Sequence, residues 1–119
     1  MLLMVLMLSA LSMPIVASAI DVQPYASAAI SGGLVNMGGG KHTLWVSLTG
    51  AYEFKTATST LYRQTSSGGW ERITSVSTSG YEARIEASKV ISLTSGYYKV
   101  ASSGTTPTSS GTIYNYYNI

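Results

Sequence analysis

Hydrophobic and polar residues alternate along much of this chain, which is the pattern of half-buried β-strands. From Tyr81 to Leu93 the odd positions are mostly apolar, whereas the even positions include charged residues. Lys89 interrupts the apolar row, and we expect a bulge or a strand end there. A second alternating row runs from His42 to Leu48, and its strand is expected to continue to Phe54. Both segments favour a sheet with one buried face.

Two more segments predict a hairpin. Thr58 to Gln64 and Trp70 to Val76 flank a Thr-Ser-Ser-Gly-Gly turn. A last strand is expected from Thr112 to Ile119, and Gly/Ser clusters separate the extended pieces along the chain. No segment carries apolar residues at helical spacing. The pattern therefore predicts an all-β protein, a small antiparallel sandwich of six or seven strands.

The order of residues around Tyr98 points to a particular kind of sandwich. A strand end at Leu93, a Thr-Ser-Gly turn and the pair Tyr98 and Val100 follow one another. In immunoglobulin and fibronectin type III domains a corner tyrosine stands two residues before a buried residue, and its hydroxyl bonds to nearby backbone. We expect Tyr98 to take that role and Tyr97 to face the opposite way.

The first 19 residues have a different composition from the rest. Met1 to Ala19 is apolar and uncharged, contains Pro14, and ends in Ala-Ser-Ala. This is typical of a signal peptide that is cleaved after Ala19, although the usual basic residues at its start are missing. An uncleaved membrane anchor is the alternative. Residues 20–39 are then an extension or a first strand, and residues 40–119 the sandwich domain.

These features resemble the small exported single-domain β proteins of unknown function that are common in Firmicutes. The resemblance covers roughly residues 40 to 119 and is carried by Leu-Tyr-Arg at 61–63, Ser-Ser-Gly-Gly-Trp-Glu-Arg-Ile at 66–73, Leu-Thr-Ser-Gly-Tyr-Tyr-Lys-Val at 93–100 and the aromatic last strand. It implies a secreted bacterial β-domain and supplies no catalytic residue. The absence of Cys means that such a domain has no disulfides.

The side chains that most enzyme sites require are scarce. His42 is the single histidine, and without Cys the usual structural zinc sites are excluded, so we expect His42 to be structural and predict no metal or other cofactor. Glu82 and Glu86 share a strand face at about 13 Å, too far apart for a glycosidase pair. The net charge of +2 is too small for nucleic-acid binding. We predict a protein that is not an enzyme.

Aromatic side chains are the remaining functional signal. In the last strand Tyr114 and Tyr116 share one face, while the other face, with Ile113, Tyr117 and Ile119, is expected to pack inward. We predict that Tyr97, Tyr114 and Tyr116 form a binding surface for cell-wall polysaccharide or an extracellular protein. Exposed rings also stabilise cross-strand pairs without binding anything. The other functions left open are a bacteriocin-like antagonist and a membrane-anchored form of the same domain.

Overall fold

The computed structural model describes residues 28–119, which form one antiparallel sheet. This confirms the predicted all-β class. The signal peptide predicted at Met1 to Ala19 lies outside the described residues. The strands are β2 (Ala29–Gly38), β3 (Lys41–Gln64), β4 (Trp70–Ser92), β5 (Tyr97–Thr105) and β6 (Ser110–Asn118).

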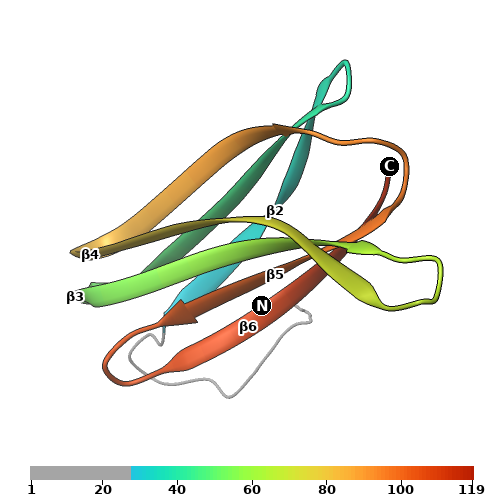
Figure 1. Cartoon of the computed structure of the whole chain (residues 1–119). Coiled ribbons are helices and arrows are strands. Elements are labelled where there is room, and N and C mark those ends of the chain that lie inside the picture. Colours follow the sequence, from blue (N-terminus) through green and yellow to red (C-terminus); the bar gives the residue numbers. More distant parts are fainter. Residues whose placement is uncertain (1–27) are drawn as a thin grey trace.

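The sheet is folded over on itself because its two longest strands bend at the same level. In Figure 1 the paired strands β3 and β4 both turn sharply near their labels and form the two arms of a V. Before the bend, residues 41–49 of β3 pair with β2 and with residues 84–92 of β4; we call this part the β2 half. After it, residues 55–64 of β3 pair with residues 70–80 of β4, and residues 56–63 also pair with β5, which pairs with β6; this part is the β6 half.

The immunoglobulin-like sandwich of six or seven strands is not confirmed. The described residues form five strands in a single curled sheet. The sequence predicted strand ends near Phe54 and Val76, but the ladder between β3 and β4 continues past both. A register shift between Thr49 and Glu53 bends the strands without ending them, as bulges do.

The bulge or strand end expected at Lys89 is also wrong. Lys89 pairs directly with Leu44, and β4 continues to Ser92. A lysine fits this inward row because its stem lies along apolar surface while its ammonium reaches polar atoms. Here Lys89 Nζ donates to Thr74 Oγ1 at 2.8 Å.

The core lies between the two halves of the folded sheet. Leu44, Val46 and Leu48 of β3 are almost fully buried, as their alternation predicted. In β4 the apolar members of the inward row from Ile85 onward, Ile85, Ala87 and Ile91, are buried or half-buried, and Lys89 is exposed. Tyr81 is 61% exposed, contrary to the prediction, because it lies at the bend and outside the space between the halves.

The bend itself is held by a buried lysine. Lys55 is fully buried, and its ammonium donates to the carbonyl oxygen of Ala51 and, at 2.7 Å, to that of Glu82. Residues 50–52 and 83 have no partner in the ladder at the bend. The Lys55 ammonium therefore supplies a hydrogen-bond donor to carbonyl groups at the point where the ladder is interrupted.

Side chains of β6 close the interior against the edge of β2 that has no strand partner among residues 28–119. The Leu34 N–H donates to Tyr117 Oη at 3.1 Å, and Asn115 Nδ2 donates to the carbonyl oxygen of Gly32 at 2.9 Å. Glycine is required at this edge, because a Cβ on Gly32 would overlap the Ser102 hydroxyl and one on Gly33 would overlap Tyr117 Oη. β2 and β6 are thus joined without a backbone ladder.

The expected environment of Tyr98 is confirmed. Its ring is 2% exposed, and its hydroxyl donates to the carbonyl oxygen of Thr94 at 2.8 Å. Beside it, Gly96 and Ile119 exchange two backbone hydrogen bonds of 3.0 and 2.9 Å. The turn after β4 is therefore fixed to both β5 and the end of β6.

Candidate binding surface

The three predicted tyrosines all lie on the outer face of the β6 half. Tyr97, Tyr114 and Tyr116 are 39, 55 and 54% exposed. The row predicted to face inward does so, since Ile113, Tyr117 and Ile119 are half-buried. The alternation of β5 and β6 was therefore assigned to the correct faces.

The hairpin between β3 and β4 brings Trp70 beside two of these tyrosines. The Trp70 ring centroid lies 5.9 Å from that of Tyr97 and 6.2 Å from that of Tyr116. Tyr97 and Tyr116 are themselves 6.2 Å apart and nearly parallel, with an interplanar angle of 18°. These distances are within the range of favourable aromatic pairs, so the three rings form one cluster drawn from three strands.

Lys99 connects this cluster to two further rings. Its Nζ lies 4.6 Å from the centroid of Trp70, 5.3 Å from that of Tyr62 and 5.7 Å from that of Tyr114. An ammonium at such distances is attracted by the negative face of each ring. We call the group of Tyr62, Trp70, Tyr97, Lys99, Tyr114 and Tyr116 the aromatic surface.

Sequence reasoning missed Tyr62 and Lys99 as members of this surface. Both were placed correctly in strands, and both face outward by alternation with Leu61 and with Tyr98. Their proximity depends on the pairing of Tyr62 with Lys99 between β3 and β5, which are far apart in the sequence. Residue types alone give no signal for that register.

Rows of hydroxyl side chains extend the same outer face beyond the rings. Two consecutive rows cross all four strands of the β6 half and consist entirely of Ser and Thr. The first row is Ser77, Thr58, Ser103 and Thr112, and the second is Ser79, Thr56, Thr105 and Ser110. In the first row Thr58 bonds Ser77 at 3.0 Å and Ser103 bonds Thr112 at 2.9 Å. The face thus combines stacked rings with groups that both donate and accept hydrogen bonds.

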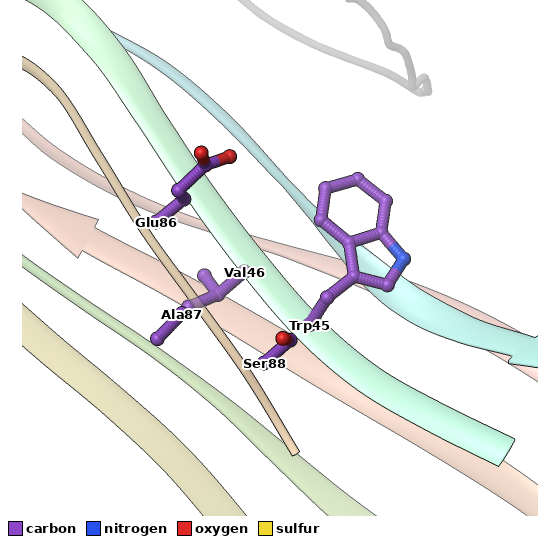
Figure 2. Close-up of a pocket in the computed structure, with 5 residues that line it drawn as sticks. All are labelled: Trp45, Val46, Glu86, Ala87 and Ser88. Carbon is purple, nitrogen blue, oxygen red and sulfur yellow. The ribbon is translucent and has the colours of Figure 1, made fainter. Parts of the chain in front are cut away.

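The outer face of the β2 half carries a shallow depression instead. Figure 2 shows Trp45 on β3 beside Glu86 and Ser88 on β4, with the indole extending toward β2. The depression has a volume of about 210 Å³. Glu86 is occupied by an ion pair with Arg84 at 3.0 Å, and both side chains are well exposed. One ring and a paired carboxylate make this a much smaller recognition surface than the one on the β6 half.

His42 lies in the inward row of β3. Its side chain is buried, and neither ring nitrogen has a hydrogen-bond partner within residues 28–119. Among residues 28–119, no three His, Asp or Glu side chains lie close enough to hold a metal ion. Within the same range there is no helix with the length and hydropathy needed to span a membrane.

Comparison of the chain with protein-family models, with curated proteins and with solved structures found no match. The aromatic surface is therefore the feature of this protein that points to a function.

Proposed function

We propose that this protein is a secreted, non-catalytic binding module that attaches to cell-wall polysaccharide through the aromatic surface. The observation that carries the proposal is the cluster of half-buried Trp70 with exposed Tyr97 and Tyr116, whose ring centroids lie about 6 Å apart on the outer face of the sheet. Rigid rings lose little conformational entropy on binding and offer large apolar area with a polar tip. The apolar C–H faces of sugar rings are suitable partners for them.

The hydroxyl rows favour a polysaccharide over a protein partner. Protein interfaces are enriched in aromatic residues but depleted in serine. Here the rings continue directly into two rows of Ser and Thr on the same four strands. Sugar hydroxyls donate and accept hydrogen bonds as these side chains do, so a chain of sugars has matching groups along the whole face.

Retention on insoluble polysaccharide tests the proposal. We expect the purified protein to sediment with isolated cell walls, and the triple variant Tyr97→Ser, Tyr114→Ser, Tyr116→Ser to remain in the supernatant. The melting temperature of the variant should stay close to that of the wild type, because all three rings are outside the core.

A second pair of exposed tyrosines provides a matched control. Tyr52 and Tyr81 are 72 and 61% exposed and their rings lie 5.4 Å apart at the bend of the sheet. The double variant Tyr52→Ser, Tyr81→Ser should sediment like the wild type. Loss of binding in this control, absence of wild-type retention, or unfolding of the triple variant would contradict the proposal.

A further inference from the structure

Lys99 of the aromatic surface and the neighbouring Arg72 carry charges of the same sign. Arg72, Tyr62, Lys99 and Tyr116 occupy a single row across the four strands, because each pairs with the next. Paired residues of an antiparallel ladder place their side chains on the same face. The row therefore presents two cations among aromatic rings.

All the Glu side chains within residues 28–119 lie outside the row of Arg72 and Lys99. Glu71 pairs with Arg63 in the row that faces the other side of the β6 half. Glu53 and Glu82 pair with each other at the bend, and Glu86 lies on the β2 half in its ion pair with Arg84. Among residues 28–119, no Asp or Glu side chain shares the outer face of the β6 half with Arg72 and Lys99.

Lys99 is placed to bind an anion. It forms no ion pair within the described part of the chain. Lys99 is half-buried, and its ammonium lies over the faces of Tyr62, Trp70 and Tyr114, which attract the charge without neutralising it. The rings also exclude water from part of the ammonium, and an ion pair is stronger where the local dielectric constant is lower. Arg72, whose Nη2 donates to Ser75 Oγ at 2.8 Å, supplies a second charge in the same row.

We propose that the polysaccharide bound by this surface is anionic, with a carboxylate or phosphate that contacts Lys99 while adjoining sugar rings stack on Trp70 and Tyr116. This inference rests on the proposed function and names the ligand class for it. A polymer that crosses the strands along the row brings a second anion to Arg72. Lys99 thus selects for charge, and the rings bind the sugar.

The test compares pairs of polymers that differ in charge but share a sugar backbone. Polygalacturonate and its fully methyl-esterified form supply the carboxylate comparison, and phosphorylated dextran and unmodified dextran supply the phosphate comparison. We expect the wild type to bind polygalacturonate or phosphorylated dextran at least about tenfold more tightly than its uncharged counterpart, with affinity falling as salt is added. Whichever of the two anionic polymers binds more tightly identifies the source of the anion.

Two substitutions of Lys99 separate charge from packing. Lys99→Met keeps most of the aliphatic stem and should lower the affinity for the anionic polymer about tenfold more than the affinity for its uncharged counterpart. Lys99→Arg should restore most of the affinity. Lys41→Met, which removes an exposed lysine in the β2 half, serves as the matched control and should bind like the wild type.

The outcomes distinguish this inference from the proposed function. Equal binding to the charged and uncharged polymers of both pairs overturns the anionic ligand and leaves polysaccharide binding intact. Equal loss on the anionic polymer and its uncharged counterpart in Lys99→Met overturns the selective role of Lys99. No binding to any of these polymers or to cell walls overturns both proposals.

Discussion

Two pairs of adjacent tyrosines, Tyr97–Tyr98 and Tyr116–Tyr117, show how different the two faces of the β6 half are. In each pair the first ring is exposed and belongs to the aromatic surface. The second ring faces inward, and its hydroxyl bonds to backbone, at Thr94 for Tyr98 and at Leu34 for Tyr117. The same residue type therefore supplies stability on one face and accessible ring area on the other. The environment, which strand alternation assigns, decides which role each tyrosine has.

The first pair should show the largest contrast in stability. Tyr98→Ala removes a buried ring and a buried hydrogen bond, and we expect a loss of about 3 to 5 kcal/mol, which is a large share of the stability of a small domain. Tyr97→Ala should cost less than about 1 kcal/mol because its ring is on the surface. Urea unfolding of the two variants measures both values. Similar losses at the two positions would mean that the faces do not differ as described.

A smaller effect is expected where the inward face meets β2. Gly33→Ala places a methyl group where Tyr117 Oη lies, so it should displace that hydroxyl and cost about 1 to 3 kcal/mol. Gly111→Ala is the control, because a Cβ there meets nothing within 4 Å. Thermal unfolding of both variants tests the closure between β2 and β6. If Gly33→Ala is as stable as Gly111→Ala, this contact does not hold the edge of β2.

The second tyrosine pair gives the smallest effect and a pH dependence. Burial raises the pKa of Tyr117 above its usual value of 10.0, although the hydrogen bond from Leu34 opposes the shift. The folded protein then keeps this phenolic proton where the unfolded chain has lost it. Its contribution to stability is therefore complete below about pH 10 and falls as the pH rises further.

Tyr117→Phe should accordingly cost about 1 kcal/mol at neutral pH, through the lost hydrogen bond, and show a shallower fall in stability above about pH 10. The free energy of unfolding, measured in urea from neutral to strongly alkaline pH, compares this variant with the wild type. Identical slopes for Tyr117→Phe and the wild type would show that Tyr117 is not the group responsible.

Local pattern was sufficient for the faces of the strands but not for their arrangement. Alternation placed Tyr97, Tyr98 and Tyr117 correctly, and the Gly68–Gly69 turn gave the hairpin, where Gly68 has the positive φ of 91° that such a turn uses. The continuation of β3 through the bend was missed, because a bulge and a strand end leave the same interruption in a hydrophobic pattern. The buried partners of Lys55 were missed for a related reason, since they are carbonyl groups that residue types do not reveal.

Part of the aromatic surface could be predicted from strand alternation, and part depended on which strands pair. Three of its tyrosines lie on alternating positions of neighbouring strands, which a sequence shows directly. The position of Lys99 between rings from β3, β4 and β6 depends on pairings between distant segments. Those pairings are determined by packing between the two halves of the sheet, so the charge of the surface became apparent only from the fold.

The closure between β2 and β6 has a consequence for the order of folding. The hydrogen bonds from Leu34 to Tyr117 and from Asn115 to Gly32 each join residues 83 positions apart. Contacts of such long range carry a large loop-closure cost and slow the formation of β proteins. During synthesis, the edge of β2 lacks the contacts with Tyr117 and Asn115 until β6 has emerged. The nascent chain therefore exposes an unpaired strand edge for most of its assembly, and a chaperone that covers this edge should raise the yield of folded protein.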